Sequence, residues 1–222
     1  MFAKGWKEGA ILMHKWFNNP PSGGAIDTTT IKMEWVLGFP LAKKVYDSIF
    51  SEQIYINGPA QLEIKKLLQF LGKDQGGVFN FHLPVTQLDP KYYINYKVVD
   101  AVPLTKDLDG LSAALGKFPL RVVVGGNVQM ESGMDMAPDR FKVNITDVGV
   151  YIRDSFDFEG SQPLGCWNVC TGEVGKANCG GGEYVSNKDF RDWRDKNGKG
   201  GDFLVYSDVK AQQPSSPASF YL

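Results

Sequence analysis

Two carboxylates three positions apart, Asp154 and Asp157, are the strongest candidates for chemistry in this sequence. Val148, Val150 and Ile152 precede them with the alternation of a strand that buries one face, and the same face continues to Asp154. A carboxylate that continues an apolar row must be hydrogen-bonded, protonated or open to a cleft. Two such acids could bind Mg²⁺ or act as a base on water, as in metal-assisted phosphoester hydrolysis.

Neighbouring side chains could complete such a site. Arg153 is adjacent to Asp154, and Arg191 or Arg194 could hold a phosphate oxygen through two hydrogen bonds. Trp167, in a later loop, could form the rim of a binding cleft. The alternative is structural: the acids cap turns or pair with Arg153 and Arg194, and the tryptophan packs back on the sheet.

Other chemistry has little support. The only histidines, His14 and His82, have no partner pattern, and the chain has no P-loop, dinucleotide fingerprint or HExxH motif. Cys166, Cys170 and Cys179 lie in one Gly-rich loop, with a spacing that matches no common zinc site. We expect free thiols there. One disulfide that closes the loop, formed in an oxidising compartment, is the alternative.

The composition is that of an ordinary globular protein of 222 residues, with 43% hydrophobic and 22% charged residues. A net charge of −1 gives no basic footprint for nucleic acid. No apolar run reaches the length of a membrane span, and the charged N-terminus is not a signal peptide. We therefore expect synthesis in the cytoplasm, and any export by a route that cleaves no leader.

Periodicity predicts the elements that position these residues. It indicates a helix at 5–17, a strand at 28–39, a helix from Pro40, a helix ending at Gly72, strands at 79–83, 92–99 and 120–124, a helix that follows Ser186, and strands at 202–209 and 219–222. Helices early and strands late predict one α+β domain over 1–222, helix-rich over 1–116 and β-rich over 117–222. The N-terminal helices would pack on an antiparallel, strongly bent sheet or open half-barrel.

The strand that carries the two acids contains a change of phase. Apolar residues occupy odd positions from Phe141 to Ile145 and even positions from Val148 to Ile152. A shift of one residue turns side chains to the other face of a sheet. The pattern therefore predicts a β-bulge or kink at Thr146-Asp147, which would re-aim the following DSFDF segment.

Several blocks together resemble an uncharacterised bacterial domain family, encoded mainly in proteobacteria and often near type VI secretion genes. The blocks are TTTIKMEWVLGF, LDPKYYINYKVV, DVGVYIRDSFDFEGSQPLGCWN, NKDFRDWR and GGDFLVYSDV. The resemblance covers nearly the whole chain. It implies an association with interbacterial toxin delivery, with a secretion-machinery or immunity protein as a possible partner, and supplies no activity.

A more distant similarity is to the catalytic domain of colicin M, a half-barrel that hydrolyses the lipid-linked peptidoglycan precursor lipid II with Mg²⁺. A glycine-rich strand pair, a D-x-aromatic-D-F motif and a late GK-x-aromatic strand carry this similarity. Asp154, Phe156 and Asp157 stand at the motif positions. Two departures weaken it: the motif tyrosine is Phe156, and the position of a His-Arg pair reads Pro163-Leu164.

These resemblances imply an antibacterial effector, delivered to the periplasm of a target bacterium, that hydrolyses a lipid-linked cell-wall precursor. Asp157 would be the general base or metal ligand, Asp154 the second carboxylate and Arg194 a phosphate clamp. Without the histidine, Arg153, Arg194 or Asp202 would have to substitute, or the scaffold is kept and the reaction lost. The alternative is a non-catalytic binding, adaptor or accessory protein of a secretion cluster.

Overall fold

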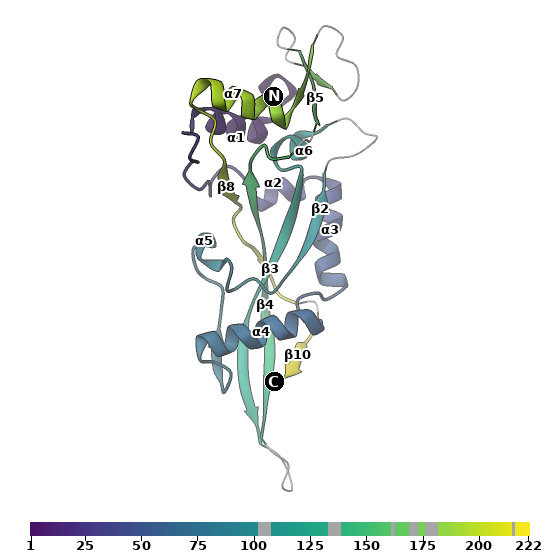
Figure 1. Ribbon diagram of the computed structural model, residues 1–222. Helices are drawn as coiled ribbons and strands as arrows, with labels where there is room; N and C mark the ends of the chain where they lie inside the picture. Colours follow the sequence, from purple (N-terminus) through teal and green to yellow (C-terminus); the bar gives the residue numbers. More distant parts are fainter. Residues whose placement is uncertain (102–107, 133–138, 161–162, 169–172, 176–181, 215) are drawn as a thin grey trace. The chain divides into compact units, whose positions relative to one another are not determined.

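The computed structural model describes residues 1–101, 108–132, 139–160, 163–168, 173–175, 182–214 and 216–222 (Figure 1). The chain divides into two compact units, each made of three segments. Unit 1 comprises Met1–Phe39, Val99–Phe118 and Arg153–Ser207; unit 2 comprises Pro40–Val98, Pro119–Ile152 and Asp208–Leu222. Each unit draws on early, middle and late parts of the sequence, and one domain over 1–222 stays a prediction.

Unit 1 contains most of the short helices and the helix that carries the candidate arginines. Its helices are η1 (Phe2–Lys4), α1 (Lys7–Asn18), α2 (Met33–Leu37), α6 (Gly110–Ala114) and α7 (Asn187–Asn197). The amphipathic pattern correctly predicts α1, which buries Leu12, Met13 and Trp16. The α1 and α6 backbones approach closely, because a Cβ at Gly9 would lie 3.0 Å from the Ala113 carbonyl oxygen.

The predicted strand at 28–39 is wrong, since its second half forms α2. Asp27 Oδ1 accepts hydrogen bonds from the backbone N–H groups of Thr29 and Thr30, both at 2.9 Å, and so turns the chain. Met33 and Val36 are then buried one helical turn apart. The β-branched residues that suggested a strand are therefore used in a turn.

In the described part of the chain, the strands of unit 1 belong to two sheets: one strand pair is part of the seven-stranded sheet, and three short strands form a separate sheet. The last residues of β4 (Arg140–Phe156) pair with β8 (Phe203–Tyr206), and Asp27 forms a parallel bridge with Val205. The small sheet has the order β6-β5-β7, with β5 at Pro163–Asn168, β6 at Glu173–Gly175 and β7 at Glu183–Ser186. Helix α7 begins directly after β7 at the predicted capping box: Ser186 N and Oγ both donate to Asp189 Oδ2, at 2.8 and 2.7 Å.

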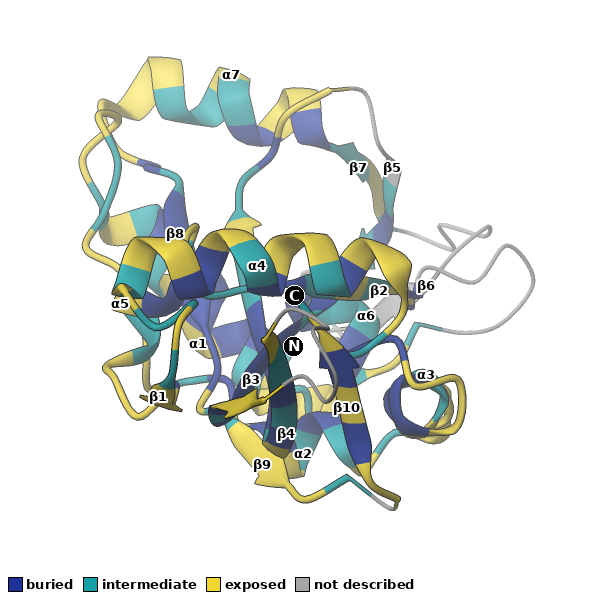
Figure 2. Ribbon diagram, turned by 90° about the horizontal axis from the view of Figure 1, so that it is seen from below, coloured by how far each residue is buried: buried dark blue, intermediate teal, exposed yellow. Residues whose placement is uncertain are grey.

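Unit 2 combines a long antiparallel strand pair with helices. Its helices are α3 (Pro40–Ser51), α4 (Gly58–Leu71) and α5 (Val85–Leu88). The strands β1 (Gly77–Phe79), β3 (Lys117–Glu131), β4 and β10 (Ala218–Tyr221) lie in that order, with β2 (Asn95–Asp100) pairing β3 and β9 (Lys210–Gln212) pairing β4. Helix α4 lies across β3 and β4 (Figure 1 and Figure 2) and buries Ile64, Leu67 and Leu68 as one stripe. Such a stripe is what an amphipathic helix packs against a sheet.

The α+β prediction is confirmed, because the helices before residue 117 pack on a mainly antiparallel sheet from the C-terminal half. Through the strands that the structure describes, the sheet is neither closed nor curled, so the strongly bent sheet or open half-barrel that the sequence suggested is not found. Among the same residues, no helix has both the length and the hydrophobicity to cross a membrane.

The predicted β-bulge is also confirmed. Gly125 pairs with Asp147, whereas Gly126 pairs with Ile145, so Thr146 is the extra residue in β4. Beyond the bulge, β4 is buried on both faces. Val148, Val150 and Ile152 on one face, and Tyr151 on the other, are all inaccessible to solvent. The change in sequence phase thus marks a real irregularity in the ladder.

Candidate functional site

The two candidate acids lie in unit 1, at the end of β4 and just beyond it. Asp154 is half-buried and pairs in register with Val205 of β8. Asp157 follows Phe156, the last residue of β4, and its Oδ1 accepts a hydrogen bond from the Glu159 backbone N–H at 3.2 Å. This contact closes an Asx-type turn, which is the structural role that the sequence allowed for Asp157.

Arg153 has its own partner across the strand pair. It lies opposite Tyr206, and its Nε donates to the Tyr206 hydroxyl at 3.2 Å. Since successive strand residues point to opposite faces of a sheet, Arg153 and Asp154 point away from each other. The structure thus keeps these two neighbouring side chains on opposite faces, as the strand alternation predicts.

Arg194 and Asp202 do come together, as an ion pair. Arg194 Nη1 lies 3.1 Å from Asp202 Oδ2, and their side chains are 17% and 31% exposed. The other carboxylate oxygen, Oδ1, accepts a hydrogen bond from the indole N–H of the fully buried Trp16 at 2.8 Å. Both oxygens of Asp202 thus bind the chain's own donors. The sequence analysis missed Trp16, whose place on the apolar stripe of α1 was the only signal.

Arg191 and Trp167 also donate to the backbone of unit 1. Arg191 Nη1 donates to the carbonyl oxygens of Phe158 and Gly160, the latter at 2.8 Å. The Trp167 indole N–H donates to the Leu164 carbonyl oxygen at 3.1 Å. These contacts tie α7 to the turn after β4, and they fix the β5 tryptophan on its own strand.

An aromatic cluster holds this region together. The rings of Phe158 and Phe190 are stacked, with centroids 4.0 Å apart and planes 6° from parallel. Trp16 contacts both rings edge-on, and Phe17 contacts Trp193 in the same way at 4.6 Å. Aromatic pairs of this geometry add to the stability that burial gives. The turn that carries Asp157 is therefore anchored between α1 and α7.

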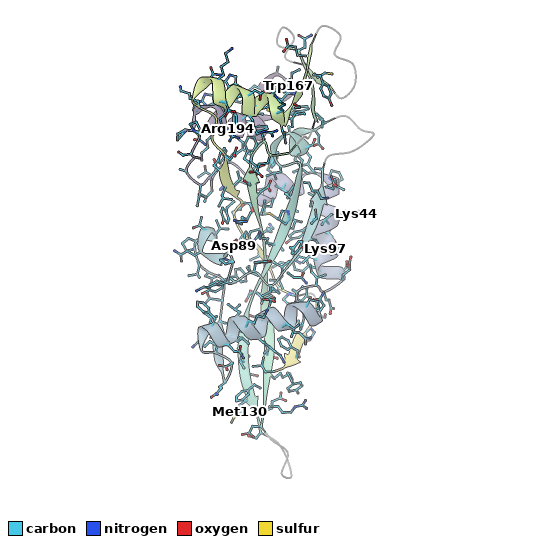
Figure 3. The ribbon with its side chains drawn as sticks, viewed as in Figure 1. Lys44, Asp89, Lys97, Met130, Trp167 and Arg194 are labelled. Carbon is cyan, nitrogen blue, oxygen red and sulfur yellow. The ribbon has the colours of Figure 1, made fainter. Side chains whose placement is uncertain are left out.

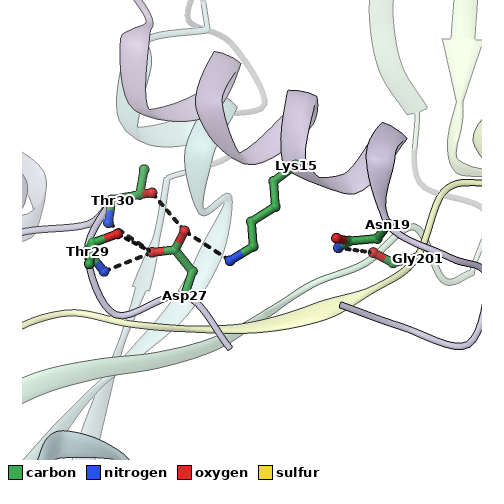
Figure 4. A network of polar contacts seen from close by, with 6 residues as sticks. All are labelled: Lys15, Asn19, Asp27, Thr29, Thr30 and Gly201. Carbon is green, nitrogen blue, oxygen red and sulfur yellow. Dashed lines mark hydrogen bonds and ion pairs between the residues drawn. The ribbon is translucent and has the colours of Figure 1, made fainter. Parts of the chain in front are cut away.

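A buried acid that the sequence analysis did not single out, Asp27, contacts Lys15 of α1. Asp27 is 5% exposed and accepts five hydrogen bonds (Figure 4): two from backbone N–H groups, two from the hydroxyls of Thr30 (2.8 Å) and Thr29 (3.5 Å), and one from Lys15 Nζ at 3.3 Å. Burial by itself raises the pKa of Asp27, but hydrogen bonds from Thr30 and Thr29 and the charge of Lys15 outweigh it and lower the pKa. Asp27 is thus a charged anchor. Its backbone N–H and C=O also bond Leu204 and Tyr206.

Unit 2 also contains a charge pair that is mostly buried, between Arg121 and Asp89 (Asp89 is labelled in Figure 3). Arg121 Nη1 contacts Asp89 Oδ1, and the two side chains are 16% and 10% exposed. Arg121 also lies over the Tyr93 ring, 4.7 Å from its centroid, and the Tyr151 hydroxyl lies 3.5 Å from Asp89 Oδ1. A buried pair of this kind fixes the segment after α5 to β3 and β4.

The donor set for a metal is sparse. No three His, Cys, Asp or Glu side chains among the described residues form a group that could hold an ion. Mg²⁺ often takes only one or two protein carboxylates and fills its remaining positions with water and phosphate oxygens. Asp154 and Asp157 fit that pattern by type, and Mg²⁺ there stays a proposal.

The expectation of free thiols is wrong for Cys166, which is disulfide-bonded and 5% exposed in β5. Cys170 and Cys179 lie outside the described residues. The Pro163-Leu164 pair, which replaces the His-Arg of colicin M, begins β5.

A family model described as "Family of unknown function (DUF6402)" matches residues 19–179 and 176–222. No curated protein and no solved structure matches the chain. The comparisons show no link to type VI secretion or to colicin M, and both stay proposals that rest on the sequence blocks.

Proposed function

The chain belongs to the DUF6402 family of unknown function, and we propose that it is a non-catalytic binding protein of a bacterial secretion cluster. Its partner would be a protein of the secretion machinery or an immunity protein. The family description assigns no activity, so the proposal rests on how the candidate side chains are used.

One observation carries this proposal: the side chains that would bind substrate are engaged by the chain itself. Arg194 and Asp202 neutralise each other, and Arg191 and Trp167 donate to backbone carbonyls. A phosphate clamp would have to break such contacts, each worth about 1.5–3 kcal/mol where a charged group takes part. Side chains committed in this way suit a rigid scaffold better than an open catalytic site.

A second candidate function is a delivered effector that hydrolyses a lipid-linked envelope precursor. The disulfide at Cys166 favours it, because disulfides form and persist in oxidising compartments such as the bacterial periplasm. In this function Asp157 would take a proton from water, and Asp154 would be the second carboxylate. Bound Mg²⁺ would supply charge stabilisation at a phosphate. Asp157 would first have to release the Glu159 N–H.

Expression in two compartments separates these functions. The wild type and an Asp154→Ala/Asp157→Ala variant are produced in the cytoplasm and in the periplasm of a test bacterium. A matched control, Asp192→Ala/Asp195→Ala, removes two exposed acids at the same spacing from α7. A binding protein leaves growth unchanged in every case. Periplasmic killing by the wild type and the control, but not by the first variant, shows the effector.

Two assays on purified protein complete the test. With lipid II and Mg²⁺, a binding protein releases no pyrophosphorylated headgroup, whereas release that Asp157→Asn abolishes would reject our proposal. Pairwise co-expression with the products of adjacent genes, followed by size-exclusion chromatography with light scattering, should give one stoichiometric complex. A monomer with every product tested would also count against binding as the function.

A further inference from the structure

The outer edge of β10 offers a surface for strand addition. β10 is the last strand of the order β1-β3-β4-β10 in unit 2 (Figure 1), and its register with β4 runs without a shift from Ala218 to Tyr221. Ala218 and Phe220 are buried at 7% and 8% exposure, whereas Ser219 and Tyr221 are exposed. The strand is therefore held firmly on one face and along its inner edge.

The ladder shows which backbone groups point outward. In an antiparallel pair, residues alternate between those that exchange hydrogen bonds with the partner strand and those whose N–H and C=O point away. The Leu222 N–H donates to the Phe141 carbonyl oxygen at 2.9 Å, in continuation of the pairing of Tyr221 with Lys142. By alternation, Ser219 and Tyr221 carry the groups that point away from β4.

Two edge strands, β1 and β10, differ in the features that prevent an edge from pairing with a strand of another chain. β1, at the opposite end, has three residues, and positive φ angles at Gly76 and Gly77 (135° and 112°) turn the chain at its start. Soluble proteins commonly block sheet edges with short strands, prolines, charges or bulges. The β10 sequence Ala-Ser-Phe-Tyr contains no charged residue and no proline. Among the described residues, the β1 end is thus turned away by its glycines, whereas β10, a strand of four residues, carries neither a charge nor a proline.

The side chains beside the open edge carry a local positive charge. Arg140 lies over the Tyr221 ring, 4.6 Å from its centroid, and Lys142 lies 5.9 Å from the same centroid. Glu131 accepts from the Tyr221 hydroxyl at 2.8 Å and pairs with Lys142 at 3.2 Å. Among the described residues, these contacts of Tyr221 are with two cations and one acid, a local excess of one positive charge, which favours a segment that carries acidic residues.

We propose that an extended acidic segment of a partner protein adds to the edge of β10 as a further strand. Its backbone would bond the outward N–H and C=O groups of Ser219 and Tyr221, and its carboxylates would lie near Arg140 and Lys142. This is a known mode of peptide recognition, in which main-chain bonds give affinity and side chains give selectivity. The inference rests on the proposed binding function and specifies the partner's chemistry.

The probe is a fluorescein-labelled, end-capped peptide, Thr-Val-Glu-Val-Glu-Val-Thr, with a second peptide that has Lys in place of Glu. Fluorescence anisotropy should show about tenfold tighter binding of the acidic peptide, and salt should weaken it. Ser219→Pro removes one outward donor and leaves the bonds to β4 intact, so it should weaken binding about tenfold. Ser219→Ala keeps that donor and should bind within about twofold of the wild type.

Hydrogen exchange on the wild type gives a reading that needs no variant. The acidic peptide should slow exchange at the Ser219 and Tyr221 amides and leave the already bonded Phe220 amide unchanged. Equal binding of both peptides, full binding by a folded Ser219→Pro protein, or no added protection would each overturn the inference. If Ser219→Pro still forms the complex with a secretion-cluster protein, strand addition fails while the binding function stands.

Discussion

Replacing Asp27 should destabilise unit 1 and remove part of its sensitivity to acid. The carboxylate is 5% exposed and accepts from two backbone N–H groups, two hydroxyls and one ammonium group. Asp27→Ala removes all five of these contacts. Asp27→Asn keeps an oxygen for the backbone donors, but its NH₂ group cannot accept from Thr30 Oγ1 or Lys15 Nζ. Asp27→Asn therefore measures the contribution of the charge, and the further loss in Asp27→Ala measures the contribution of the hydrogen bonds that hold the turn.

The expected losses follow from these contacts. Hydrogen bonds that involve a charged group contribute about 1.5–3 kcal/mol, and neutral ones about 1 kcal/mol. Thr29 is exposed and Thr30 half-buried, so water can replace some of the lost acceptors. We expect a loss of about 3 kcal/mol for Asp27→Ala and about 1.5 kcal/mol for Asp27→Asn in the free energy of unfolding.

The pH dependence has a definite sign. The pKa of Asp27 is lower in the folded protein than in the unfolded chain. A lowered pKa contributes stability above the unfolded value, near pH ~4, and that contribution disappears as the pH falls through the folded value. The difference between wild type and Asp27→Asn should therefore be constant above pH ~5 and shrink below pH ~4.

Tryptophan fluorescence in urea measures the unfolding of unit 1, which contains Asp27. All five tryptophans lie in the segments of unit 1, at Trp6, Trp16, Trp35, Trp167 and Trp193. The control is Asp192→Asn, which removes a carboxylate that is 57% exposed in a surface ion pair and should cost under about 0.5 kcal/mol. Titrations from pH 7 to pH 3 give the unfolding free energy of each protein.

Two results would refute this reasoning. If Asp27→Asn is as stable as wild type at pH 7, the charge contributes nothing to the anchor. If the variant is less stable by the same amount at pH 3 as at pH 7, the stabilising group is not the ionised Asp27 carboxylate.

Three further predictions concern single contacts. Tyr55 is fully buried and its hydroxyl is the one buried side-chain polar atom without a partner among the described residues, so Tyr55→Phe should leave stability unchanged or raise it by about 1 kcal/mol in thermal unfolding. Gly126→Ala would place a Cβ 1.9 Å from the Asn144 carbonyl oxygen, and calorimetry should show a loss of about 3 kcal/mol or more. Asp202→Ala should cost about 2 kcal/mol in urea because it leaves the mostly buried Arg194 without its carboxylate, and Asp202→Asn should recover part of that loss.

Local patterns in the sequence predicted local structure well. The phase change at Thr146-Asp147 located the bulge, and the spacing of Ser186 and Asp189 located the start of α7. Both signals depend on residues a few positions apart, whose geometry the backbone fixes directly. The α+β class followed from the order of such segments.

The candidate site was harder to predict, because its contacts join distant parts of the chain. Trp16 and Asp202 are 186 positions apart, and no periodicity reveals their hydrogen bond. The strand predicted at 28–39 failed for a related reason: the side chain of Asp27, held by Lys15, turns the chain where propensity favours extension. The disulfide at Cys166 was foreseen only as the alternative to free thiols, because the cysteine spacing does not decide between the two.

The threading of the two units has a consequence for synthesis on the ribosome. Neither unit has all its strands until late: unit 1 needs the chain as far as Ser207, and unit 2 needs residues 208–222 to supply β9 and β10. Pairings over such sequence separations form slowly, because a long loop must close before the contacts stabilise it. A growing chain would therefore expose the apolar faces of β3 and β4 from their synthesis until β8, β9 and β10 have been made. Cells that make this protein would have reason to shield the nascent chain with a chaperone.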